Sequence, residues 1–254
     1  MAKRTERPTD TAWQKIFRAY KIDDFSFAKQ PFLISAEQIK AATNNLEPRI
    51  LCKQDTRESR PIVFQERNLF ILPVKNGEYA IVKGEGYVDL SHIAESTLIY
   101  CSKLDFELET SKIGNSEMQH LDFAYASSLV RTFMQDDSLV LTIRGRKYTP
   151  DGGFTFRVGR QVLEAKSVQT EVDAGYEGRK QVVLIEVKSS NVQNTIIRQM
   201  YYPFRQWQHH TRKQVLTMFF EKYEETYSFW QFAFDDVEDY NSIRLVRSAK
   251  YEIK

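Results

Sequence analysis

The sequence predicts an α/β fold, a mixed central sheet flanked by helices with an α+β module on its N-terminal side. The composition suits a folded globular protein, since 42% of the 254 residues are apolar and 28% are charged. Helical and strand-like apolar patterns alternate along the chain, and no apolar run approaches the roughly 18–20 residues of a membrane span. Cys52 and Cys101 lie far apart, which argues against a disulfide framework and a structural zinc site.

The first 110 residues are expected to form the N-terminal module. Thr11–Tyr20 has the apolar spacing of an amphipathic helix, and Ser35–Gln38 is a capping box that opens a second helix ending near Thr43. Arg49–Val88 has a β-rich pattern in which Asn76-Gly77 is typical of a hairpin turn. The strands expected there are Ile62–Phe64, Leu69–Leu72 and Tyr79–Val82.

Residues 111–254 are expected to form the second module. Ser116 is a helix cap, and the apolar spacing after it predicts one helix to about Gln135. A second helix is predicted from Asn194 to Tyr202, where Pro203 ends or kinks it. The predicted strands are Ser138–Ile143, Phe154–Val158, Val168–Asp173, Val182–Val187 and Val215–Phe220, followed by two late edge strands, Tyr227–Phe234 and Ile243–Val246.

Acidic residues and a lysine mark the end of a buried strand. Four apolar residues precede Glu186, and the alternation of side chains along a strand places Glu186 and Lys188 on one face. If the strand that contains Asp173 pairs with this one as a hairpin, the two carboxylates converge. Carboxylate oxygens suit Mg²⁺, which stabilises charge on a phosphodiester and makes a bound water more acidic.

This arrangement resembles the PD-(D/E)xK nuclease superfamily. The segments 171–177, 184–188 and 198–205 are similar to one group of bacterial type II restriction endonucleases, and the similarity spans about Gly114–Val246, with a fainter trace at Arg57–Pro73. The departure is that no proline precedes Asp173. The resemblance implies a restriction-endonuclease-like core at residues 111–254 and a candidate DNA-recognition part at residues 1–110.

The resemblance also implies a function. It is that of a Mg²⁺-dependent, sequence-specific endonuclease for double-stranded DNA, with Asp173, Glu186 and the carbonyl of Val187 as metal ligands and Lys188 as a catalytic group. We expect a homodimer, because two strands must be cut and a two-fold protein matches a palindromic site. A prokaryotic cytoplasmic location follows, with a cognate DNA methyltransferase as a functional rather than physical partner and no membrane association.

Further residues have two interpretations each. Glu117 matches an acidic residue that reaches the metal site through water in many superfamily members, or else it satisfies a helix dipole. Gln199 matches a polar residue that contacts the lysine or the phosphate, or else it lies on the surface. Glu177 is either a second metal ligand or a turn residue, and the turn is favoured.

DNA contacts are expected from basic side chains, because guanidinium groups suit phosphates and guanine edges. The net charge is only +2, but Val187–Phe220 contains no acidic residue. The alternative for this basic stretch is a solvated helix face. The candidates are Arg57, Arg60, Arg144, Arg146, Lys147, Arg198 and Arg205.

A second segment matches the motif literally. Pro150-Asp151 is followed by Glu164 and Lys166 at the spacing that separates Asp173 from Glu186 and Lys188. We favour the Asp173 site, because Asp151 lies in a turn sequence and the strand before Glu164 is short.

Two other functions stay open at this stage. One is a repair or junction-type nuclease of the same fold without strict sequence specificity. The other is a non-catalytic DNA-binding protein, against which the intact Asp173, Glu186 and Lys188 argue.

Overall fold

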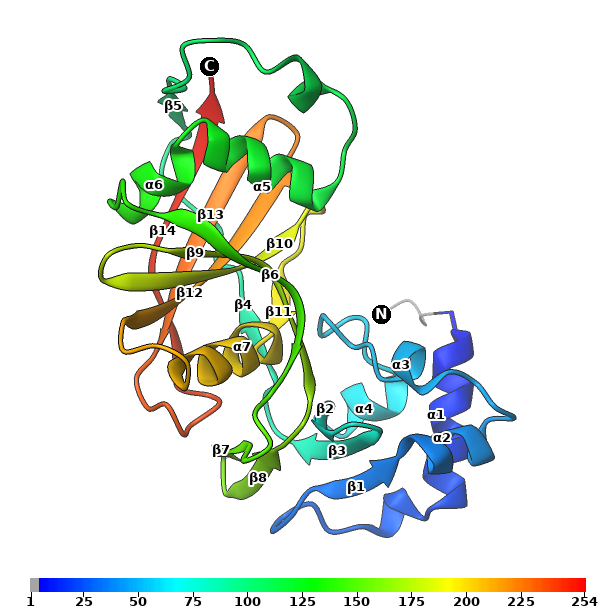
Figure 1. The fold of residues 1–254 in the computed structure, drawn as a ribbon. Helices are drawn as coiled ribbons and strands as arrows, with labels where there is room; N and C mark the ends of the chain where they lie inside the picture. Colours follow the sequence, from blue (N-terminus) through cyan, green and yellow to red (C-terminus); the bar gives the residue numbers. More distant parts are fainter. Residues whose placement is uncertain (1–4) are drawn as a thin grey trace.

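A seven-stranded mixed sheet organises the protein, and a three-stranded sheet with its own helices lies beside it (Figure 1). The structure is a computed structural model that describes residues 5–254, except the side chain of Lys112. Met1–Arg4 lie outside the described residues. The α/β class with a mixed central sheet is thereby confirmed. Among the described residues, no helix has the length and apolar character to cross a membrane.

The small-sheet unit comprises residues 8–83. Ser35 caps its second helix as predicted: the Ser35 hydroxyl accepts from the Gln38 N–H at 3.1 Å, and the Ser35 N–H donates to the Gln38 side chain at 2.8 Å. The hairpin turn at Asn76-Gly77 is also confirmed. The elements are α1 (Pro8–Ala19), β1 (Phe32–Ser35), α2 (Ala36–Ala42), α3 (Pro48–Leu51), α4 (Ile62–Glu66), β2 (Leu69–Lys75) and β3 (Glu78–Lys83).

The strand predicted at Ile62–Phe64 is wrong, because these residues begin α4. The buried carboxylate of Asp10 in α1 accepts from the Ile62 N–H at 2.8 Å, which satisfies a free donor at the start of this helix. Phe64 then packs between Trp13 and Phe17, with ring centroids 4.7 and 5.6 Å away. A capping group 52 residues away decides this segment.

The main sheet has the order β5-β14-β13-β12-β10-β9-β6, with parallel pairs at β10–β12 and β14–β5 and antiparallel pairs elsewhere. Of the two strands predicted at an edge, Tyr227–Phe234 is not one, since β13 lies between β12 and β14. Ile243–Val246 does lie at an edge, because β14 pairs with β5 only at Tyr251–Ile253. Short β5 adds to the end of β14, which extends to Ile253. The strands are β5 (Leu98–Tyr100), β6 (Val140–Tyr148), β9 (Gln169–Glu177), β10 (Gln181–Lys188), β12 (Gln214–Tyr223), β13 (Thr226–Phe234) and β14 (Ile243–Ile253).

Helices cover both faces of β10. Val183 and Ile185 pack with α5 (Glu117–Ala126) and α6 (Leu129–Met134), whereas Val182 and Leu184 pack with α7 (Arg198–Gln208). The single helix predicted from Ser116 to Gln135 is interrupted, because Ser128 adopts a left-handed conformation (φ 69°) between α5 and α6. Pro203 lies inside α7 without ending it.

The helix predicted from Asn194 begins only at Arg198. Residues Asn194–Ile196 instead form β11, which pairs with β4 (Tyr87–Asp89). A separate two-stranded ribbon of β7 (Phe154–Val158) and β8 (Gln161–Ala165) projects from the main sheet. Thus residues 84–110, assigned to the N-terminal module from sequence, supply β4 and β5. The Tyr202 hydroxyl donates to the Pro73 carbonyl at 2.9 Å, one of several contacts that join the small-sheet unit to α7.

Candidate active site

Three side chains predicted to form the site meet at the end of β10. The ammonium Nζ of Lys188 lies 2.5 Å from Oε1 of Glu186 and donates to the Val187 carbonyl at 2.9 Å. The backbone N–H of Val187 donates to Oδ2 of Asp173 at 2.8 Å. Asp173, Glu186 and Lys188 therefore form one connected polar cluster.

The strand register produces this convergence. In the antiparallel β9–β10 hairpin, Ile185 pairs with Ala174 and Leu184 with Gly175, so Asp173 comes next along β9, beside Glu186. A Cβ added at Gly175 would lie 2.7 Å from the Cβ of Ile143 on β6. Glycine is needed there because β6 crosses β9 closely.

Burial shapes the charges of the site. Glu186 is 8% exposed, and burial raises its pKa to about 7 although Lys188 opposes the shift. Burial also raises the pKa of Asp173, while the hydrogen bond from Val187 lowers it. For Lys188, burial lowers the pKa, but attraction to Glu186 and Asp173 more than offsets this, so the net pKa is raised. The lysine is therefore protonated at neutral pH.

Two further predicted residues reach the cluster. The side-chain amide of Gln199, on α7, donates from Nε2 to Oε1 of Glu186 at 2.6 Å. Glu117, in the first turn of α5, accepts from the Ser189 N–H just after β10 at 3.3 Å. Its charge also favours the protonated form of Lys188. Gln199 is thus not a free surface residue, and Glu117 lies beside the site as well as at a helix N-terminus.

Sequence reasoning missed Thr195, whose hydroxyl donates to Oε1 of Gln199 at 3.1 Å. Within the helix predicted from Asn194, Thr195 and Gln199 stand at i and i+4 on one face, which is a signal that could have found the pair. Thr195 lies on β11 instead, directly before α7.

The donor set fits a hard cation. Asp173 Oδ1 and Glu186 Oε2 accept no hydrogen bond from the described residues, so each carboxylate keeps one oxygen available to a cation. Among the described residues, no group of three or more His, Cys, Asp or Glu side chains could hold a metal. A Mg²⁺ ion bound here would depend on two carboxylates, a carbonyl, water and phosphate, which is a donor set that Mg²⁺ accepts.

Three basic residues predicted to bind DNA lie on the edge strand β6, which leads to the site. Arg144 pairs with Asp122 at 2.5 Å, and Arg146 pairs with Glu171 at 3.3 Å. Lys147 follows on the same exposed strand. The pKa of Arg144 is raised mainly by Asp122 and to a smaller extent by the charge of Asp173. This part of β6 therefore interacts electrostatically with the site. Arg198 precedes Gln199 on α7 and favours the charged form of Glu186.

Three other arginines are engaged within the fold. Arg60 is buried and donates to the carbonyl oxygens of Arg57 and Leu69. Arg57 forms an ion pair with Asp89, and Arg205 donates to the carbonyls of Thr155 and Val237. The DNA surface proposed below uses the four basic residues on β6 and beside Gln199, and does not include Arg57, Arg60 and Arg205.

The alternative motif does not assemble. Asp151, Glu164 and Lys166 are all exposed, and no described contact joins them. Asp151 accepts from the Ser167 hydroxyl at 3.2 Å. Glu177 is the last residue of β9, four residues beyond Asp173, and pairs with Lys213 at 2.5 Å, so it does not join the metal donors.

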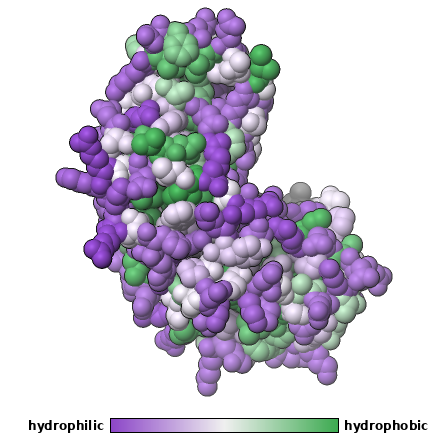
Figure 2. Space-filling view, viewed as in Figure 1, coloured by the Kyte–Doolittle hydropathy of each residue, from purple (hydrophilic) through white to green (hydrophobic). Residues whose placement is uncertain are grey.

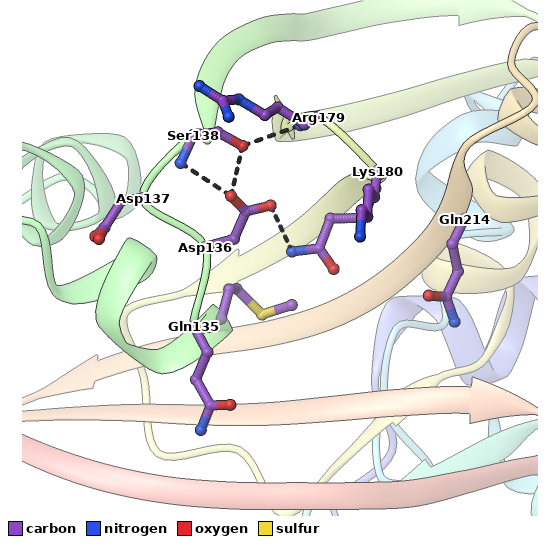
Figure 3. Close-up of a pocket in the computed structure, with 9 residues that line it drawn as sticks. Gln135, Asp136, Asp137, Ser138, Arg179, Lys180 and Gln214 are labelled. Atoms are coloured by element: carbon purple, nitrogen blue, oxygen red, sulfur yellow. Dashed lines mark hydrogen bonds between the residues drawn. The ribbon is translucent and has the colours of Figure 1, made fainter.

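A hollow of about 740 Å³ lies at the beginning of β10, away from the site (Figure 3). Its carboxylate, Asp136, accepts from the N–H and the hydroxyl of Ser138 and from the Gln181 amide. Asp136 is thus committed to holding the turn after α6, and the second carboxylate of the hollow, Asp137, is paired with Lys103.

The fold and the site define a mixed α/β protein with a buried Asp–Glu–Lys cluster at the end of a parallel strand pair. The chain belongs to the family described as Domain of unknown function (DUF6997), whose model matches residues 82–252. A second family model, described as Domain of unknown function (DUF6996), matches residues 10–81. The two matches meet within β3. No curated protein and no solved structure matches the chain.

Proposed function

We propose that this protein is a Mg²⁺-dependent, sequence-specific endonuclease for double-stranded DNA, of the type II restriction class. The observation that carries the proposal is the convergence of Asp173, Glu186 and Lys188 at the end of β10, with one carboxylate oxygen of each acid left available. An acidic pair beside a lysine in a buried setting is costly to fold unless it serves a function.

The surrounding elements support the same proposal. The hairpin partner β9, the parallel neighbour β12 and helices on both faces of β10 are the parts that the PD-(D/E)xK resemblance implies for a restriction-endonuclease-like core. Gln199 and Glu117 also stand where that resemblance implies accessory polar residues.

The chemistry follows from what each side chain holds. A Mg²⁺ ion held by Asp173, Glu186 and the Val187 carbonyl would neutralise charge on the scissile phosphate and make a bound water more acidic. The Val187 N–H holds Oδ2 of Asp173, which leaves Oδ1 available to a metal. Lys188, now paired with Glu186, can turn its ammonium to the phosphate or the attacking water. Glu117 adds negative charge that keeps this lysine protonated.

A path for DNA leads to the site. Arg144, Arg146 and Lys147 follow the exposed edge β6, and Arg198 lies beside Gln199. Figure 2 shows a hollow in the outline of the molecule, between the part that contains the main sheet and the small-sheet unit. In Figure 1 the end of β10 and the start of α5 lie on the side of this hollow. A duplex in this hollow would contact both parts, which suits base recognition by one part and cleavage by the other.

The deciding experiment is digestion of a sequenced plasmid by the purified protein in Mg²⁺, with every end mapped. Ends at one short sequence support the proposal. Ends without a consensus would replace it with a nuclease of relaxed specificity, and an intact plasmid across many sequences would contradict it. Sedimentation on a cut-resistant site in Ca²⁺ tests the proposed homodimer, and a neighbouring methyltransferase gene that blocks digestion tests the restriction role.

A further inference from the structure

The side-chain amide of Gln199 is held at both ends. Its Nε2 donates to Oε1 of Glu186 at 2.6 Å, and its Oε1 accepts from the Thr195 hydroxyl at 3.1 Å. An amide group has a donor end and an acceptor end, so a donor placed at the oxygen fixes which end faces the carboxylate. Thr195 thereby selects the orientation in which Gln199 attracts Glu186.

Thr195 is itself fixed. It is 3% exposed, and its backbone pairs with Val88 of β4. A β-branched side chain in a strand has few rotamers, which keeps the hydroxyl pointed at Gln199. The Thr195 hydroxyl links β11 to the site through Gln199.

The neighbours of Thr195 are tied to the small-sheet unit. The Arg57 N–H donates to Oδ1 of Asn194 at 2.7 Å, and the Asn194 amide donates to the Glu58 carboxylate at 3.0 Å. On the other side, the Ile196 N–H donates to the Asp55 carbonyl at 2.9 Å. The loop of residues 55–58 thus holds β11 on both sides of Thr195.

We infer that Thr195 is a positioning residue for the site, and that the small-sheet unit holds it in place through Asn194. The inference rests on the proposed function for its purpose. With Gln199 and Lys188 both bound to Oε1 of Glu186, Oε2 stays directed to the metal donors. Without the Thr195 hydroxyl, the amide can reverse or rotate away, and Glu186 loses one of the two groups that orient it.

The first test does not depend on cleavage. In protein labelled with ¹⁵N-glutamine, the side-chain NH₂ signal of Gln199 is assigned by its loss in Gln199→Leu. A hydrogen bond to a carboxylate shifts one amide proton downfield. Thr195→Val should move this proton upfield, whereas Thr195→Ser, which keeps the hydroxyl, should hold it near the wild-type position. Thr195→Ala is a second hydroxyl-free variant in case valine does not pack.

The outcomes separate positioning from a merely structural role. An unchanged Gln199 signal in the folded valine or alanine variant would overturn the inference, as would an equal shift in the serine variant. Asn194→Ala should shift the signal in the same direction as Thr195→Val. If Asn194→Ala leaves it unchanged, the part assigned to the small-sheet unit is wrong.

The second test measures cleavage. Loss of one hydrogen bond corresponds to about 5-fold in an equilibrium constant. Thr195→Val should therefore raise the Mg²⁺ concentration for half-maximal cleavage by about that factor, and Thr195→Ser should restore it. A wild-type protein that cuts no DNA would refute the proposed function, while the Gln199 signal would still decide the role of Thr195. Cleavage by the wild type with an unchanged Mg²⁺ dependence in Thr195→Val would overturn the positioning role.

Discussion

Lys188 folds back along β10 onto Glu186, with its ammonium 2.5 Å from the carboxylate and 2.9 Å from the Val187 carbonyl. It therefore contacts two of the three groups expected to bind Mg²⁺. Either the ammonium of Lys188 or a Mg²⁺ ion can offset the negative charge of the buried acidic pair, so the lysine can hold the site together before a metal binds.

Asp173→Asn should abolish cleavage while leaving DNA binding intact or tighter, because the variant loses a metal ligand and a charge that repels phosphate. Cleavage is measured in Mg²⁺ and binding by gel shift in Ca²⁺, which binds with looser geometry and should support binding without cleavage. Asp151→Asn is the matched control from the alternative motif. Wild-type cleavage by Asp173→Asn would remove Asp173 from the site.

Lys188→Met should fold and bind DNA but lose on the order of 10²-fold or more in cleavage rate, as expected for a positioned proton-transfer group. Arginine at this position should not restore the rate, because a planar guanidinium is bulkier and cannot replace the compact ammonium between Glu186 and the Val187 carbonyl. Single-turnover rates on a short duplex provide the measurement. An active Lys188→Met beside an inactive Lys166→Met would move the site to Asp151, Glu164 and Lys166.

Mg²⁺ affinity should rise with pH up to about 7 and then level off, because burial raises the pKa of Glu186 to about that value and a carboxylate must lose its proton to bind metal. Below pH 7, each unit of acidification should weaken binding about tenfold. Calorimetric titration with Mg²⁺ from pH 5.5 to 8.5 tests this. In Glu186→Gln the dependence on this group should disappear, and a wild-type affinity that is flat across pH 7 would contradict the assignment.

Gly175→Ala should destabilise the protein by about 1–3 kcal/mol, because the added Cβ meets the Cβ of Ile143 at 2.7 Å across the β6–β9 pair. Gly152→Ala is the control, since its Cβ would meet nothing within 4 Å. Urea unfolding of both variants gives the difference in free energy. Equal stability of the two variants would mean that β6 and β9 are less tightly packed than the structure places them.

The sequence alone determined the local features and the pairing of the main acidic residues. A period of two along a strand puts Glu186 and Lys188 on one face whatever surrounds them, and the hairpin then brings Asp173 beside them. The Ser35 capping box and the Asn76-Gly77 turn likewise act over a few residues. Such features are set by backbone geometry and short-range hydrogen bonds, which explains why they could be predicted.

Tertiary structure decided the secondary structure and burial of segments whose contact partners lie far away in the sequence. Ile62–Phe64 is helical because Asp10 caps it and an aromatic core receives Phe64. Asn194–Ile196 is a strand because β4 pairs with it, and this pairing is what brings Thr195 to Gln199. Arg60 resembles a DNA contact in sequence but is buried against backbone carbonyls. In each case local propensity was overridden by a hydrogen-bond partner or a packing surface many residues away, which no short-range pattern contains.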